Sequence, residues 1–219
     1  MSFLKKLLVT AAFSAAMFVN AAYAENVKIA GNYIGTDPTG TIAKPNGTGI
    51  SILGGYVKIG GVDDADRNVI SGNTSAGITK DSSNFGVASE IDGNYVGTKA
   101  DGVSPLGNSR GIFVFGRRVR IGGNRSNIIA FNALEGINVT ALSIPDPQAD
   151  VYGNSIHSNG GLGIDLNRDS PTTNDIGTQD ADTGANNLQN NPVLTFFYAG
   201  SGGTDVHLNV RFSSLANTT

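Results

Sequence analysis

The charged residues with the most potential chemistry recur at one position of a repeated segment. Aligned by the glycines that end each copy, they are Lys28, Lys58, Glu90, Arg120 and Asp150. If successive copies are neighbouring strands, these side chains lie about 4.8 Å apart. From Lys58 onward their signs alternate, which is typical of a solvated charge ladder. The alternative is a cationic strip that binds an acidic polysaccharide, helped by Arg117, Arg118 and Arg125.

Two aromatic residues offer a second kind of chemistry. Phe113 belongs to another repeated outward column, made of Ser51, Thr79, Phe113, Asn138 and Asp165, and Phe115 follows on the same side. Sugar rings can stack on such aromatics where a sheet face is exposed. The alternative is that a neighbouring loop covers them. Phe113 and Phe115, with Arg117 and Arg118, are the candidate ligand-binding residues.

Oxygen ligands for Ca²⁺ gather toward the C-terminal part of the chain. Residues 160–165 read Gly-Gly-Leu-Gly-Ile-Asp, the start of a calcium-binding nonapeptide repeat, but only one copy is present. The segment also fits a rung opening of the fold described below. The candidate metal ligands are Asp165, Asp169, Asp175, Asp180 and Asp182. The competing interpretation is a solvated acidic loop. His157, a lone outward histidine, is a candidate general base.

These residues sit on a strong internal repeat. Residues 29–36 (Ile-Ala-Gly-Asn-Tyr-Ile-Gly-Thr) return 62 positions later as residues 91–98 (Ile-Asp-Gly-Asn-Tyr-Val-Gly-Thr). The Val57–Gly61 segment returns with the same offset as Val119–Gly123. Within each copy a Gly-Ile segment, a strand ending in glycine and a segment opening with asparagine follow one another. Three short strands per turn predict stacked rungs, and no helical periodicity competes with that pattern.

The repeat predicts an all-β right-handed parallel β-helix of about five rungs. Alternate residues of each strand point inward, so aliphatic side chains stack from rung to rung. Asparagines at one corner would form a hydrogen-bonded ladder; they are Asn32, Asn68, Asn94, Asn127 and Asn154. Two 13-residue insertions, residues 36–48 and 98–110, start from the same corner of the solenoid and are separated by two rungs. They are either recognition loops or insertions that the fold tolerates without a function.

The chain divides into three parts. Residues 1–24 have a signal-peptide pattern: Lys5 and Lys6, an apolar run to Val19, and the Ala-Tyr-Ala cleavage motif at 22–24. Residues 25–192 are the expected β-helix. Residues 193–219 contain an expected β-hairpin that closes the stack or begins a truncated following domain. We therefore expect an exported protein, located in the periplasm, on the cell surface or outside the cell.

Composition restricts the partners. The formal net charge of −3 disfavours nucleic-acid binding, and the absence of cysteine excludes disulfides and cysteine-ligated metals. After the leader, no segment approaches the roughly 20 apolar residues of a transmembrane helix. Open solenoid ends favour self-association.

The Gly-Ile, glycine-ended and asparagine-led segments resemble the bacterial right-handed parallel β-helix repeat proteins of the pectin-lyase-like superfamily. The resemblance covers about residues 26–192 and is specific for fold. It implies a carbohydrate-active enzyme only if a catalytic cluster is present. The Asn-Thr-Asp and Gly-His-Gly motifs of the polygalacturonase-like members do not occur. Asp92 and Asp150 near Arg120 approximate the lyase arrangement of Ca²⁺-binding carboxylates beside an arginine base.

Two functions follow. The first is a non-catalytic exported scaffold, an adhesin-like or glycan-binding surface module. The alternative is a Ca²⁺-dependent polysaccharide lyase or epimerase that acts on an acidic polysaccharide, with Ca²⁺ as its cofactor. A lyase needs Asp92, Arg120 and Asp150 to surround a groove, whereas a scaffold lets them pair along a flat face.

Overall fold

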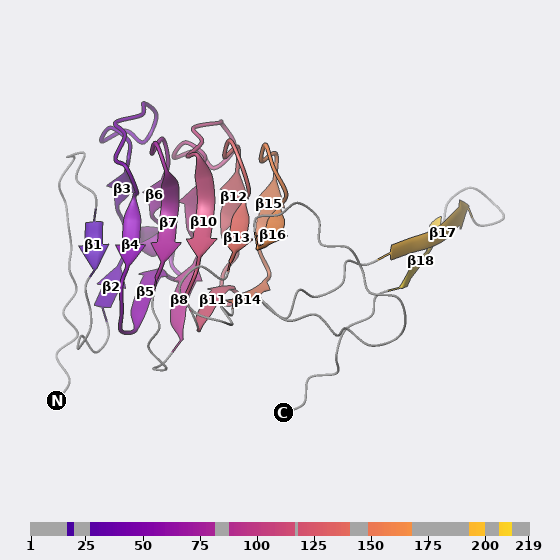
Figure 1. Cartoon of the computed structure of the whole chain (residues 1–219). Helices are drawn as coiled ribbons and strands as arrows, with labels where there is room; N and C mark the ends of the chain where they lie inside the picture. The colour runs from indigo at the N-terminus through magenta and orange to yellow at the C-terminus, as the bar shows by residue number, and fades with distance from the viewer. Residues whose placement is uncertain are drawn as a thin grey trace.

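The protein is built from short parallel strands, as its β-branched, glycine-punctuated sequence predicts. A computed structural model describes residues 27–81, 88–116, 118–140 and 149–167 with their side chains, and the strands at 17–19, 193–199 and 206–211 by their backbone. Within these residues the fold is all-β, with parallel sheets stacked as a solenoid of about four turns (Figure 1). The expected parallel β-helix is confirmed.

Each turn contributes one strand to each of three parallel sheets. Sheet 1 contains β1 (Met17–Val19), β4 (Ile50–Ile52), β7 (Ala76–Lys80), β10 (Arg110–Val114), β13 (Ile137–Val139) and β16 (Ile164–Leu166). Sheet 2 contains β2 (Val27–Ile29), β5 (Val57–Gly60), β8 (Ser89–Asp92), β11 (Val119–Gly122) and β14 (Ala149–Tyr152). Sheet 3 contains β3 (Tyr33–Ile34), β6 (Val69–Ile70), β9 (Tyr95–Val96), β12 (Ile128–Ala130) and β15 (Ser155–His157).

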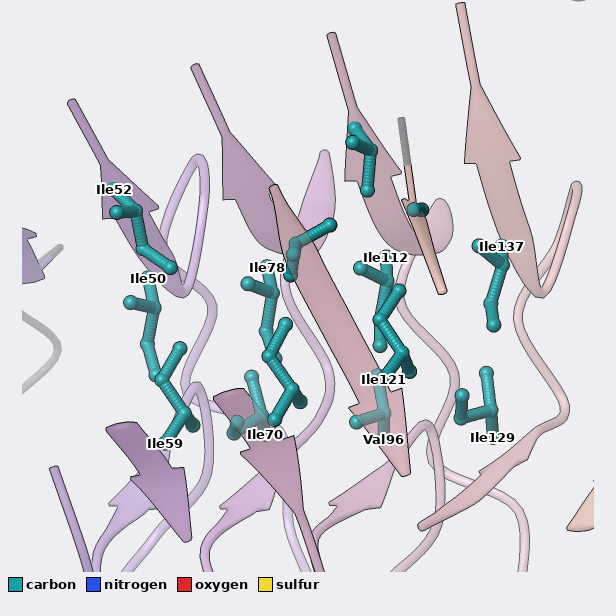
Figure 2. Close-up of a cluster of buried hydrophobic side chains, with 14 of the residues drawn as sticks. Ile50, Ile52, Ile59, Ile70, Ile78, Val96, Ile112, Ile121, Ile129 and Ile137 are labelled. Atoms are coloured by element: carbon teal, nitrogen blue, oxygen red, sulfur yellow. The ribbon is translucent and has the colours of Figure 1, made fainter. Parts of the chain in front are cut away.

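The core is a set of aliphatic columns inside the three sheets. On sheet 1, Ile50, Ile78 and Ile112 pair in register from turn to turn and are fully buried. Figure 2 shows them beside Ile59 and Ile70 of the other two sheets. No single turn could bury such side chains alone, so each turn depends on its neighbours for stability.

The expected asparagine ladder is present and nearly all buried. Each side-chain Nδ2 donates to the Oδ1 of the asparagine on the next turn, at 2.8–3.0 Å. A second ladder, which the sequence interpretation missed, crosses another corner with Nδ2–Oδ1 distances of 2.8–3.2 Å. Its members are Asn46, Asn73, Asn108, Asn132 and Asn159. Each precedes the glycine of a Gly-Ile segment by three or four residues, and that spacing was the signal to find it.

Two features at the ends of the chain differ from the simplest expectation. The structure places Met17–Val19, inside the expected leader, as β1, a parallel edge strand beside β4. The expected hairpin exists as β17 (Val193–Ala199) and β18 (Val206–Arg211), paired antiparallel. These two strands form their own sheet and do not extend any solenoid sheet, so the hairpin does not close the stack by strand addition. Among the described residues, no helix is long and apolar enough to cross a membrane.

Candidate functional site

The charged column on sheet 2 has the predicted register. Lys28 faces Lys58, Lys58 faces Glu90, and Glu90 faces Arg120 on successive strands, with Asp150 beyond Arg120. Glu90 accepts ion pairs from both neighbours: Lys58 Nζ and Arg120 Nη2 each lie 3.1 Å from its Oε2. Lys28 instead pairs with Asp66, at 2.7 Å. The column is therefore a ladder of opposite charges at its centre.

Asp92 is the buried member of this region. Its carboxylate is 0 % exposed, although it lies on the outward face two residues after Glu90. Oδ2 accepts hydrogen bonds from Arg120 Nη2 and Asn124 Nδ2, both at 3.2 Å, while Oδ1 is buried without a hydrogen-bond partner. Gly60 faces Asp92 on the preceding turn with φ +81°, and a Cβ there would collide with the Asp92 carbonyl oxygen. The same crowding occurs at Gly122, where a Cβ would collide with the Tyr152 carbonyl oxygen.

Arg120 is held as a cation by two carboxylates. Burial alone would lower its pKa, but the negative charges of Glu90 and Asp92 outweigh that effect and the pKa is raised. Burial and the charge of Glu90 raise the pKa of the nearby Tyr56 hydroxyl. A guanidinium that stays protonated can bind anions or hydroxyl groups but is a poor general base.

The third candidate catalytic residue stands apart from this cluster. Asp150 is exposed, and although it faces Arg120 in register, the guanidinium turns toward Glu90 and Asp92. The structure therefore brings Asp92 and Arg120 into contact and leaves Asp150 outside. The charges pair along the sheet.

The candidate aromatic site forms on β10. The Phe113 and Phe115 rings are in contact, with centroids 5.1 Å apart and planes tilted by 51°. The Arg110 guanidinium lies 5.9 Å from the Phe113 centroid and pairs with Glu135. Both rings are half-buried. Arg118 is exposed, with φ 57°, just before β11, and Arg117 lies outside the described residues.

The outward column around Phe113 contains both half-buried and buried residues. The register of all five members is as predicted. Ser51, Thr79 and Phe113 are half-buried, but Asn138 and Asp165 are buried. The last two positions are therefore buried although they continue the outward column of Phe113.

Only one of the five proposed Ca²⁺ ligands, Asp165, lies within the described residues. Asp165 is buried on β16, and its backbone carbonyl accepts a hydrogen bond from Asn138 Nδ2 at 3.3 Å. The other four candidates, Asp169, Asp175, Asp180 and Asp182, lie outside the described residues. Within the part of the chain that is described, no three acidic or histidine side chains gather as a metal site. His157 is exposed, with its ring edge-on to Phe131 and its Nδ1 3.2 Å from Ser158 Oγ.

The two inserted loops share one conformation and touch each other. Each closes on itself through an antiparallel bridge, Thr36 with Ala43 in one and Thr98 with Pro105 in the other. The loops then meet across the intervening turn, where Ala100 N donates to Gly40 O at 3.0 Å. We call residues 36–48 and 98–110 together the double loop.

Each half of the double loop is organised by an aspartate. Asp37 accepts backbone hydrogen bonds from Thr41 and Ile42, and Asp101 accepts them from Val103 and Ser104. Hydrogen bonds lower the pKa of both carboxyls to about 2, beginning with those from Thr39 and Ser104. Specific hydrogen bonds therefore define the conformation of both loops. The apolar side chains of Ile42 and Val103 are exposed on them.

Lys80 is the titratable residue that the sequence interpretation missed. It occupies an inward position of sheet 1, between Ile52 and Val114 in register, and is only 2 % exposed. Burial lowers its pKa from 10.5 to about 8, although the charge of Asp81 opposes that shift. The strand alternation that places Ile78 inward also places Lys80 inward, so the signal was in the sequence.

Replacing Lys80 with methionine is expected to stabilise the protein. Below pH 8 both the folded and the unfolded chain carry the proton, and the buried charge costs about 3 kcal/mol. Between pH 8 and 10.5 the unfolded chain binds more protons, so this cost disappears as the pH rises. The gain in Lys80→Met should therefore be largest at pH 7 and vanish near pH 10.5 in urea unfolding curves. The exposed Lys44→Met should show no such trend.

Comparison of the chain with family models, with curated proteins and with solved structures gave no match.

Proposed function

We propose that this chain is an exported, non-catalytic solenoid module that binds an acidic glycan. The supporting observation is the position of Arg120. A lyase of the kind considered above would use this arginine as a base facing its substrate across a groove, together with Asp92 and Asp150. Here its guanidinium lies 3.1 Å from Glu90 and 3.2 Å from Asp92, so it is paired with carboxylates of the neighbouring strand.

The binding surface that we favour is the outward face of β10. Phe113 and Phe115 offer partly exposed ring faces to the C–H groups of a sugar. Arg118, exposed at the start of the next strand, offers a guanidinium to a carboxylate or sulfate. β10 is paired on both sides, with β7 and β13, so this surface would bind with little loss of conformational entropy.

The test is binding and turnover measured on the same samples. Purified full chain would be titrated calorimetrically with oligogalacturonate, alginate and heparin oligosaccharides. Unsaturated products and new reducing ends would be followed with Ca²⁺ and with chelator. We expect binding without product. Phe113→Ala should weaken binding by about fivefold, since an aromatic contact contributes about 1 kcal/mol beyond area burial.

Phe131→Ala is the matched control, because it also removes a half-buried ring but from the turn after β12. It should leave affinity unchanged. Calcium-dependent product that disappears in Arg120→Ala would overturn the proposal in favour of the lyase or epimerase. Equal affinity in Phe113→Ala and the wild type would exclude β10 as the binding face.

A further inference from the structure

The two ends of the solenoid have the same strand order. The first turn after β1 runs through β2, β3 and β4, on sheets 2, 3 and 1. The last turn runs through β14, β15 and β16, on the same sheets in the same sequence. A second copy stacked on the first would therefore place β14 beside β2, β15 beside β3 and β16 beside β4. Every contact would repeat a parallel pairing that already exists inside the chain.

Both asparagine ladders are directional, and the first ends in complementary groups. In the first ladder, the backbone N–H and Nδ2 of each member donate to the Oδ1 of the next. At the N-terminal end, Asn32 Oδ1 is therefore left buried with no donor. At the other end, Asn154 is the last member, and no carboxamide oxygen follows it within the described turns. Asn154 of one copy is thus positioned to donate to Asn32 of another.

The side-chain columns also match across such a junction. On sheet 1, Ile164 would meet Ile50 of the next copy; Ile164 is 45 % exposed although it continues the buried column of Ile112 and Ile137. On sheet 2, the exposed Asp150 would meet Lys28, which extends the alternation of charge between Glu90 and Arg120.

One strand already occupies this junction. β1 pairs with β4 in the register Met17–Ile50, which is the register that Ile164 would take beside Ile50 of a second copy. β1 lies inside the segment that the sequence pattern predicts to be a cleavable leader.

We propose that removal of the leader exposes the N-terminal end of the solenoid, which then accepts the C-terminal end of a second copy, head to tail. The contact joins two different surfaces, so it generates open filaments and not closed dimers. Sheet 2 has five strands, so each copy would lengthen the filament by about 24 Å. The leader strand would keep the precursor monomeric until it is cleaved.

The test starts from the folded full chain with a specific protease site introduced after Ala24. Light scattering and negative-stain electron microscopy would follow the protein before and after cleavage, with circular dichroism to monitor the β-structure. We expect a monomer before cleavage and thin rods after it, with an unchanged spectrum. Rods before cleavage, a monomer after cleavage, or loss of the β-spectrum would each overturn the proposal.

Charge reversal identifies the junction. Cleaved Asp150→Lys would place lysine against Lys28, and cleaved Lys28→Glu would place glutamate against Asp150, so each alone should assemble poorly. An equimolar mixture should assemble by alternation, because every junction then joins opposite charges. Ile164→Lys should raise the concentration needed for assembly by at least about tenfold, since it buries a charge in the junction. The exposed Val103→Lys, on the double loop, should not. A mixture that assembles no better than its components would exclude this junction.

Discussion

Replacing Arg120 with alanine is expected to lower the free energy of unfolding by about 3 kcal/mol, because it leaves a buried carboxylate without its cation. Asp92 is fully buried, and Arg120 is the charged partner of its Oδ2. Glu90 would lose one of its two ion pairs in the same variant. Equilibrium unfolding in urea, followed by circular dichroism, measures the effect.

Two further variants separate charge from packing. Asp92→Asn in the Arg120→Ala background removes the unpaired charge and should recover a large part of the lost stability. Arg67→Ala removes a guanidinium from Asp64, which is 82 % exposed, and from the face of the Tyr95 ring, 4.5 Å away, and should lower stability by only about 1 kcal/mol. If Arg120→Ala is no more destabilising than Arg67→Ala, the ion pair with Asp92 contributes nothing to the fold.

The second large effect is expected in the middle of the first asparagine ladder. Asn94→Ala should lower the free energy of unfolding by about 3–4 kcal/mol, because each buried polar group left unpaired costs about 1–3 kcal/mol. Asn94 Nδ2 donates to Ile59 O, Asp92 O and Asn127 Oδ1, each at 3.0 Å. Its Oδ1 accepts from the backbone and side chain of Asn68. Urea unfolding again provides the measurement.

The end of the same ladder supplies the control. Asn154 is half-buried and has no following asparagine in the described turns, so Asn154→Ala should be clearly less destabilising than Asn94→Ala. The double variant Asn94→Ala/Asn127→Ala should fall short of the sum of its single variants, because the two residues share a hydrogen bond. Additive effects would show that the ladder does not act as a unit.

The fold could be predicted because every turn of the solenoid repeats the same three-strand arrangement. Copies with the same spacing must stack in the same register, so the positions of Lys58, Glu90 and Phe113 relative to their neighbours followed from the alignment alone. Burial did not follow, because it depends on what covers the outside of a sheet. Asn138 was assigned to the outward column, yet nothing in the repeat indicated that it would be buried.

The repeat pattern also could not predict contacts between residues that lie two turns apart. The hydrogen bond from Ala100 to Gly40 joins loops that are two turns apart, and Arg125 likewise reaches back to Val62 and Asp64. Stacking rules describe only adjacent turns, so these contacts depend on loop conformation. Lys80 was missed for a different reason: alternation placed it inward, but a lysine in an aliphatic column contradicts the usual burial preference.

The one-way donation in the two ladders makes the solenoid electrically asymmetric. Each ladder carboxamide donates one N–H to the carboxamide oxygen of the next turn, and its own oxygen points back toward the first turn, so the individual dipoles add along the axis, as peptide dipoles do in an α-helix. The N-terminal end is consequently the negative pole and the C-terminal end the positive pole. Two identical ends brought together would repel, which leaves head-to-tail as the favoured alignment of two copies.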